Sequence, residues 1–176
     1  MTLPVLIIYK PFRSYKSLMP LNPEKKTLLL FVLLIGMLVS CDSKRVYDEN
    51  SIMEKNSWNA GNKLKFGVTI SDAGLRYNIY LKVRNGPEYP YSNLFLFLNT
   101  VTPDGRISRD TLELTLADYD GRWLGSGTGS VKFSKFLLQK GMRFRETGKY
   151  VFELEQAMRV RDLKGIRDVG LRIEKE

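Results

Sequence analysis

Apolar and polar residues alternate with a period of two along most of the chain from residue 63 onward. In residues 63–70 every second side chain is apolar, and residues 76–84 repeat this spacing. Because successive side chains of a β-strand point to opposite faces, the alternation predicts strands with one buried and one solvated face. Similar runs lie at residues 111–116, 150–154 and 169–173. The pattern therefore indicates antiparallel sheets, which commonly keep one face on a core and the other in water.

Two further patterns complete the predicted elements. Residues 94–98 are apolar at every position, which predicts a central strand covered on both faces. A shorter strand is expected around Val131 and Phe133, whereas residues 134–140 and 155–163 lack alternation and are expected to form short helical connections. About seven strands joined by Gly, Pro, Asn and Asp turns predict an all-β fold, an antiparallel β-sandwich of the jelly-roll or Ig-like kind.

The N-terminal part of the chain has a different pattern. Residues 28–39 are all apolar or Gly, two Lys residues precede them, and Cys41 follows closely. At 1.5 Å per residue these twelve residues make a helix of about 18 Å, shorter than the hydrocarbon core of about 30 Å. A basic start followed by a short apolar run is typical of a secretory signal peptide, so we expect residues 1–40 to be removed.

Cys41 is the single cysteine of the chain and ends the sequence Leu38-Val39-Ser40-Cys41, which resembles the lipobox of bacterial lipoproteins. Only a thiol can accept the diacylglycerol group at this position. We therefore predict a mature protein that begins at Cys41 with a covalent diacylglycerol and an N-acyl chain such as palmitate, and with no other cofactor. Two or three acyl chains hold a protein durably on a membrane, whereas one holds it reversibly. The alternative for Cys41 is a buried free thiol.

The predicted organisation has three parts. Residues 1–40 form the signal peptide, residues 41–62 are polar and mixed in charge and form a lipidated tether, and residues 63–176 form the β-sandwich domain. Forty residues is long for a signal peptide, and Met19 stands shortly before the basic start of the apolar run. We therefore expect translation to begin at Met19, which makes residues 1–18 an artefactual extension.

Composition narrows the range of functions. The chain has 176 residues, of which 43% are hydrophobic, so it fits one folded domain and is not a disordered chain. It has no His and one Cys, which excludes Ser-His-Asp and Cys-His catalysis, His-ligated zinc, Cys-rich metal sites and an internal disulfide. The formal charge is +9, of which +4 precedes Cys41, and the later Lys and Arg are interspersed with acids. That mixture is typical of a solvated surface, so no nucleic-acid partner is expected.

Two loop motifs have a weak resemblance to ligand sites. Residues 125–130 have glycines spaced as in phosphate-binding loops, but a strand pattern follows them where such a loop needs a helix. Asp118, Asp120 and Gly121 resemble part of a calcium loop, but the twelfth position counted from Asp118 is Gly129, not a carboxylate. We interpret the first motif as a turn or bulge between strands and the second as an exposed turn.

Three aromatic residues in turn-rich stretches are the candidate binding residues: Tyr89, Tyr91 and Trp123. Exposed aromatic rings form platforms for protein partners or for sugar rings. The alternative is that these rings plug the ends of the sandwich, because large aromatic side chains are generally core formers.

Several short segments follow one another in a characteristic order along nearly the whole mature chain. They are the lipobox at Cys41, Trp58 ahead of Leu64-Lys65-Phe66, Val83-Arg84-Asn85 leading into Tyr89-Pro90-Tyr91-Ser92-Asn93-Leu94, Asp110-Thr111, Gly121-Arg122-Trp123-Leu124-Gly125-Ser126-Gly127, Gly148-Lys149-Tyr150-Val151-Phe152, and Leu163-Lys164-Gly165-Ile166-Arg167-Asp168-Val169-Gly170-Leu171. This series resembles the gliding-motility-associated lipoprotein family GldH. The resemblance implies an all-β lipoprotein with Cys41 as the lipid attachment site and no recognised catalytic residues.

The resemblance also implies a place in the cell. Members of the family are envelope components required for gliding, in bacteria whose surface adhesins are exported by the type IX secretion system. We therefore expect a non-catalytic, lipid-anchored protein that contacts other envelope proteins of the gliding and secretion apparatus. Asp42-Ser43-Lys44-Arg45 lacks a dense acidic run of the kind associated with surface export, which favours the periplasmic face of the outer membrane.

Two other functions stay open at this point. The first is a carbohydrate- or peptidoglycan-binding envelope lipoprotein, with Tyr89, Tyr91 or Trp123 stacking on sugar rings. The second is an enzyme, which the lack of His and of a recognisable pair of acids disfavours.

Overall fold

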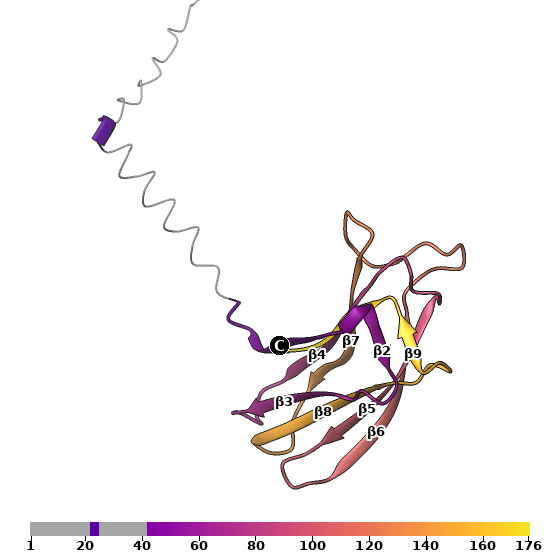
Figure 1. Ribbon diagram of the computed structural model, residues 1–176. Coiled ribbons are helices and arrows are strands. Elements are labelled where there is room, and N and C mark those ends of the chain that lie inside the picture. The colour runs from indigo at the N-terminus through magenta and orange to yellow at the C-terminus, as the bar shows by residue number, and fades with distance from the viewer. Residues whose placement is uncertain (1–21, 25–41) are drawn as a thin grey trace, which may run out of the picture. The chain divides into compact units, whose positions relative to one another are not determined.

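The computed structural model describes residues 22–24 and 42–176 (Figure 1). The chain separates into two compact units, Met1–Cys41 and Asp42–Glu176, and the strands belong to the second. Apart from residues 22–24, the predicted signal peptide lies outside the described residues, as do the Met19 start and Cys41, and all three stay predictions. Within the described residues, no helix combines the length and the apolar character that crossing a membrane requires.

In residues 42–176, antiparallel strands form two four-stranded sheets and one two-stranded sheet. The first sheet has the order β1-β10-β4-β7, formed by Arg45–Ile52, Ile166–Lys175, Tyr77–Asn85 and Lys132–Met142. The second has the order β3-β8-β5-β6, formed by Leu64–Ile70, Gly148–Gln156, Asn93–Val101 and Ile107–Thr115. The third pairs β2 (Ser57–Asn59) with β9 (Asp162–Lys164), and a 3-10 turn, η1 (Glu54–Asn56), precedes β2.

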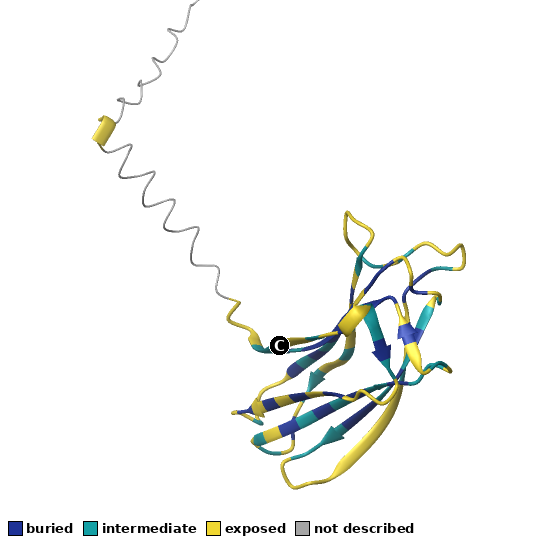
Figure 2. Ribbon diagram, viewed as in Figure 1, coloured by how far each residue is buried: buried dark blue, intermediate teal, exposed yellow. Residues whose placement is uncertain are grey.

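The core lies between the two four-stranded sheets. In β3 the apolar side chains from Leu64 to Ile70 are buried and those between them are exposed, as the alternating colours of β3 and β8 show (Figure 2). One hydrophobic cluster joins the inward side chains of both sheets. The predicted antiparallel β-sandwich and its period-two strands are therefore confirmed. Because the cluster and the sheets lie wholly within residues 42–176, this unit has its own core and folds as a domain.

β5 lies between β8 and β6, so the predicted central position of residues 94–98 is confirmed. The expected cover on both faces is wrong, because the outward side chains of Phe95 and Phe97 are only partly buried. The guanidinium of Arg109 lies 4.2 Å from the centre of the Phe97 ring. A cation–π contact from the neighbouring strand thus replaces a second layer over Phe97.

The segment expected to be a tether is folded from Arg45 onward, which corrects the predicted domain start at residue 63. β1 pairs with β10 along its length, and Trp58 in β2 has no exposed surface. The indole nitrogen of Trp58 donates a hydrogen bond to the Asn62 carbonyl at 2.8 Å. Only residues 42–44 separate Cys41 from the first strand. β1 is an edge strand with few apolar residues and β2 is very short, so neither shows a period-two pattern.

The expected helical connections are strands and turns. Residues 134–140 lie inside β7, and residues 155–163 complete β8, turn, and enter β9. The register of β7 against β4 shifts between Tyr77 and Ile79 and again between Ile79 and Tyr80. Such bulges interrupt the alternation of inward and outward side chains, which hides the strand in the sequence. With β1, β2 and β9, the described residues hold ten strands where about seven were expected.

Candidate binding site at the loop end

The two ends of the sandwich carry different connections. Where β5 begins and β6 ends, at what we call the loop end, the connections are residues 86–92, 116–131 and 157–161. Where β1 begins, at what we call the entry end, the connections are residues 71–76, 102–106 and 143–147. The long connection between β6 and β7 projects beyond the sheets (Figure 1). The three aromatic residues singled out in the sequence all lie at the loop end.

The structure brings Tyr89, Tyr91 and Trp123 together. The centre of the Tyr89 ring lies 5.8 Å from that of Tyr91 in an edge-on arrangement and 6.3 Å from that of Trp123. Tyr89 is only 3% exposed, and its hydroxyl donates a hydrogen bond to the Asn93 carbonyl at 2.7 Å. Burial raises the pKa of Tyr89 well above its usual value, so its hydroxyl stays neutral. Tyr89 therefore packs the end of the core, while Tyr91 and Trp123 keep part of their surface in solvent.

The backbone beneath Tyr89 requires a glycine. Gly165 connects β9 to β10 at a φ of +85°, and a Cβ at this position would lie 2.3 Å from the Tyr89 nitrogen. The Gly165 carbonyl also accepts a hydrogen bond from the Gly86 N–H at 2.7 Å. Only a residue without a side chain adopts this conformation and permits this contact. The close approach holds the aromatic connection against the β9–β10 turn.

A groove opens beside Tyr91, with a volume of about 430 Å³. It is lined by Tyr91, Asn93, Phe95, Ala157, Met158 and Arg159, and we call it the Met158 groove. Phe95 donates its backbone N–H to the Met158 sulfur at 3.3 Å. Aromatic, thioether and amide groups thus share one concave surface, and such surfaces bind partners through apolar contact with a few hydrogen bonds.

The wall of the Met158 groove is held in place by a buried glutamine. Gln156 is 5% exposed, and its amide nitrogen donates to the Val160 carbonyl at 2.8 Å. Its amide oxygen accepts a hydrogen bond from the Met158 N–H at 2.9 Å. The loop that carries Met158 is therefore ordered without a partner, which lowers the entropy cost of binding.

A second hollow, of about 640 Å³, adjoins the groove and shares Asn93 with it. It is lined by Ser92, Asn93, Glu113, Thr115, Ala117, Asp118, Tyr119, Gly121 and Leu124, and we call it the Tyr119 hollow. Asn93 donates its amide hydrogen to the Glu113 carboxylate at 2.8 Å. The Leu124 side chain is 60% exposed, and Tyr119 is fully exposed. Apolar side chains in water at this end are a feature of interaction surfaces.

The two loop motifs, residues 118–121 and 125–130, both form turns, as the sequence indicates. The Asp118 carboxylate accepts hydrogen bonds from the backbone N–H groups of Asp120 at 3.0 Å and Arg122 at 2.8 Å. These bonds cap an exposed turn, and the Arg122 contacts lower the Asp118 pKa. Residues 125–130 form the turn before β7, where Ser126 and Phe133 exchange backbone hydrogen bonds at 2.8 Å.

No group of three or more potential metal ligands lies close together in the described ranges, 22–24 and 42–176. The loop end offers aromatic faces, amides and apolar side chains in two adjoining hollows. Sequence reasoning found Tyr91 but missed Phe95 and Met158. The apolar run that contains Phe95 predicts a strand covered on both faces, and Met158 reaches the groove only because the β8–β9 loop folds back over β5.

Comparison with known proteins identifies similar sequences. A family model described as GldH lipoprotein matches residues 45–173. A protein of Christiangramia forsetii called "Gliding motility lipoprotein GldH homolog" is 38% identical over 85% of this chain and 95% of its own. A protein of Flavobacterium johnsoniae called "Gliding motility lipoprotein GldH" is 36% identical over 80% of this chain and 91% of its own.

One solved structure is similar over part of its length. The crystal structure of dimeric latent PorU from Porphyromonas gingivalis aligns with 76% of this chain and 13% of the PorU chain. The sequences are 11% identical and the TM-score is 0.34, so this similarity supports no conclusion on fold or function.

Proposed function

The chain belongs to the GldH lipoprotein family, and from that premise we propose that this gliding-motility lipoprotein is a non-catalytic component associated with the gliding and type IX secretion apparatus. The observation that carries the proposal is the extent of the family match. It spans residues 45–173, which include nearly all of the folded domain and both hollows of the loop end.

We place the anchor at Cys41, with diacylglycerol on the thiol and an acyl chain on the nitrogen. Residues 42–44 separate it from β1, and three extended residues span at most about 11 Å. The entry end is then held close to the lipid surface and the loop end points away from it. The periplasmic face of the outer membrane is the proposed location.

The partners in this proposal are other envelope proteins of the apparatus, and they bind at the loop end. The Met158 groove and the Tyr119 hollow supply concave surface with aromatic and apolar lining. Anchoring confines the protein to one membrane, which raises its effective concentration near anchored or integral partners. Modest contacts at the loop end are therefore sufficient for assembly.

The test is the gliding speed of single cells after clean deletion of the gene, with the intact copy restored in parallel. Loss of gliding that the intact copy rescues is expected. A copy with Cys41→Ser is expected to fail and to leave the membrane fraction. Unchanged gliding after deletion would contradict the motility role, and full rescue by the soluble Cys41→Ser protein would contradict the anchor.

The same deletion strain tests the link to secretion. If the protein serves the type IX apparatus, export of surface adhesins falls together with gliding. Normal export in cells that no longer glide would separate the protein from secretion. Restoring the gene with Tyr91→Ala tests the loop end, and Phe97→Ala is the matched control because Phe97 is also a partly buried aromatic but lines neither hollow.

Peptidoglycan or carbohydrate binding is the second candidate function. It is favoured by one observation: Tyr91 and Trp123 stand partly exposed in one cluster with an open groove beside them. Aromatic rings beside amides are suited to sugar rings and their hydroxyl groups. Binding of peptidoglycan fragments that Trp123→Ala abolishes without unfolding the domain would favour this function, and absence of binding by the intact protein would reject it.

A further inference from the structure

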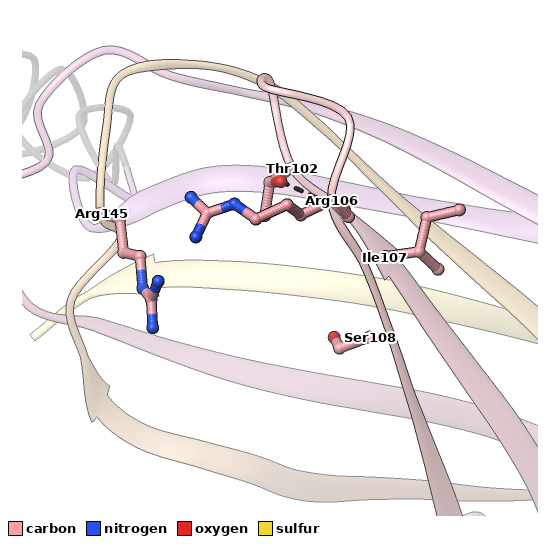
Figure 3. Close-up of a pocket in the computed structure, with 5 residues that line it drawn as sticks. All are labelled: Thr102, Arg106, Ile107, Ser108 and Arg145. Carbon is pink, nitrogen blue, oxygen red and sulfur yellow. Dashed lines mark hydrogen bonds between the residues drawn. The ribbon is translucent and has the colours of Figure 1, made fainter.

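The entry end carries a cavity of about 260 Å³ between the β5–β6 turn and the β7–β8 loop. It is lined by Thr102, Arg106, Ile107, Ser108 and Arg145 (Figure 3). The side chain of Arg106 extends from one loop toward Arg145 on the other. Two guanidinium groups and the Ser108 hydroxyl therefore border one small opening, and these are donors that phosphate oxygens accept, whereas the Thr102 hydroxyl donates within its own turn.

The β5–β6 turn presents Arg106 in a fixed position. The Thr102 N–H donates to the Arg106 carbonyl at 2.9 Å, and the Thr102 hydroxyl donates to the same carbonyl at 3.1 Å. The Nε of Arg106 donates to the Asp104 carboxylate at 2.5 Å, which leaves its terminal nitrogens available. Among the described residues, Arg145 has neither an ion pair nor a hydrogen bond from its side chain, so its full charge faces the opening.

The cavity lies within a larger basic surface. Seven further Lys and Arg residues at the entry end are exposed, and their side chains form no ion pair with another described residue. They are Lys44, Arg45, Arg76, Lys140, Arg143, Lys149 and Lys175. We call these seven, together with Arg106 and Arg145, the basic rim. Of the acids at this end, Asp42 and Glu174 are paired with Arg172 and Asp104 with Arg106, while Asp72, Glu146 and Glu176 form no ion pair within the described residues.

The loop end pairs a larger share of its charges. Arg122 contacts both Asp118 and Asp120, and Arg167 contacts Glu88 at 2.8 Å. Twelve Lys and Arg residues in the described part of the chain are exposed and form no ion pair there; eight lie at the entry end, where the chain passes to Cys41, and four lie at the loop end, namely Lys55, Arg159, Arg161 and Lys164.

We propose that the basic rim binds the phosphate groups of anionic lipids in the membrane that carries the anchor. Lipid headgroups fit better than a free anion because the cations spread across the whole end of the domain and the cavity is only one part of them. Ile107, which borders the cavity, is 71% exposed and is placed to enter the boundary between headgroups and acyl chains. Docking through the rim fixes the domain upright, with the loop end directed away from the lipid.

The proposal rests on the anchor at Cys41 only for the choice of membrane. The rim itself is tested with unlipidated protein, so a failure of the rim and a failure of the anchor are distinguishable. The test uses residues 42–176, which contain the complete core. Binding to vesicles of phosphatidylcholine is compared with binding to vesicles in which about one quarter of the lipid is phosphatidylglycerol.

The intact domain is expected to sediment with the anionic vesicles and not with the neutral ones. Each basic side chain near an anionic surface contributes about fivefold to binding, so Arg143→Ser with Arg145→Ser is expected to weaken binding about 25-fold. The matched control is Arg161→Ser with Lys164→Ser, which removes the same charge from exposed positions at the loop end. Circular dichroism confirms that each variant is folded.

Two results would overturn the proposal. One is an equal loss of vesicle binding in both double variants, which would show that binding depends on the net charge of the domain and not on the basic rim. The other is displacement of the intact domain from the vesicles by inorganic phosphate at the same phosphate concentration, which would assign the cavity to a free anion. Raised salt is expected to release the domain, because screening weakens exposed charges.

The orientation is tested on the full lipidated chain in the same anionic vesicles. A fluorophore on Ser71→Cys at the entry end is expected to be quenched by lipids with a nitroxide headgroup, and one on Tyr119→Cys is not. Equal quenching of the fluorophores at positions 71 and 119 would overturn the docked orientation. So would quenching at position 71 that does not decrease when Arg143 and Arg145 are replaced by Ser.

Discussion

Both ends of the sandwich hold a cluster of three aromatic rings, but the clusters differ in exposure. At the entry end Tyr77, Phe144 and Tyr150 are each at most 3% exposed, with ring centres 5.2 Å and 4.7 Å apart along the cluster. At the loop end Tyr89 is buried, but Tyr91 and Trp123 are not fully covered. The entry cluster seals the core, whereas the loop cluster seals it and also offers ring surface to a partner.

The two ends also differ in how many of their charged side chains form ion pairs. The entry end exposes eight cations that form no ion pair with a described residue and the loop end exposes four, while Arg122 and Arg167 at the loop end are paired with nearby acids. One domain therefore has a basic face suited to lipid phosphates and an aromatic face suited to proteins or sugars. Four variants measured by their stability compare how the two ends are held together.

The largest effect is expected for Phe144→Ala at the entry end. Phe144 packs against both Tyr77 and Tyr150, so its removal leaves a cavity in a sealed cluster. We expect the free energy of unfolding, measured with urea, to fall by about 3–5 kcal/mol. A loss below about 1 kcal/mol would mean that the entry cluster can collapse and is not the tighter of the two.

Arg172→Met is expected to lower the unfolding free energy by about 2 kcal/mol, since Arg172 bonds three carboxylates near the entry end. Burial raises the pKa of Asp48 and of Glu174, but hydrogen bonds from Arg172 and Lys residues outweigh it and hold both values below normal. These groups stabilise the fold above their unfolded pKa of about 4, and the stabilisation is lost as pH falls through the lowered values.

The pH dependence of the stability of the Arg172→Met variant is a more specific test of these contacts than its stability at neutral pH. Without Arg172 the pKa values of Asp48 and Glu174 rise toward normal, so the variant loses less stability than the intact protein as pH falls below about 4, and the unfolding free energies of the two proteins converge in acid. Urea unfolding from neutral to acidic pH measures the difference. Parallel curves for the two proteins would show that Arg172 does not control these carboxylates.

Tyr89→Phe tests the buried member of the loop cluster. The ring remains and only the hydrogen bond to Asn93 is lost, so we expect a decrease of about 1 kcal/mol in unfolding free energy. Because burial raises the Tyr89 pKa, the intact protein loses stability as pH rises above the unfolded value of about 10. That alkaline loss should be smaller in the variant. If the intact protein and the variant lose the same unfolding free energy at alkaline pH, Tyr89 does not contribute to that loss.

The smallest effect is expected for Arg122→Ala. Arg122 pairs with Asp118 and Asp120 at the loop end, but its side chain is 75% exposed. Exposed ion pairs contribute little, so the unfolding free energy should change by less than about 1 kcal/mol. A larger loss would show that paired charges stabilise the loop end as they do the entry end.

The sequence alone determined the features that depend on local pattern. Alternation predicted β3 and β4 to within one residue at each end and the middle of β8, because the side chains of a strand change face at every position whatever its partner. Composition excluded His-dependent and Cys-pair chemistry, and the order of the segments from Trp58 to Leu171 pointed to the family that the comparisons show.

Only the tertiary structure decided the features that depend on distant partners. β1 becomes a strand because β10, more than a hundred residues later, supplies its hydrogen bonds, with Asp48 opposite Arg172. Trp58 is buried in β2, whose partner β9 lies about a hundred residues later with Leu163 opposite Trp58, and Met158 meets Phe95 across a separation of 63 positions. No local period reports such contacts. The Met158 groove and the basic rim therefore appear only once the strands are paired and the loops at each end are brought together.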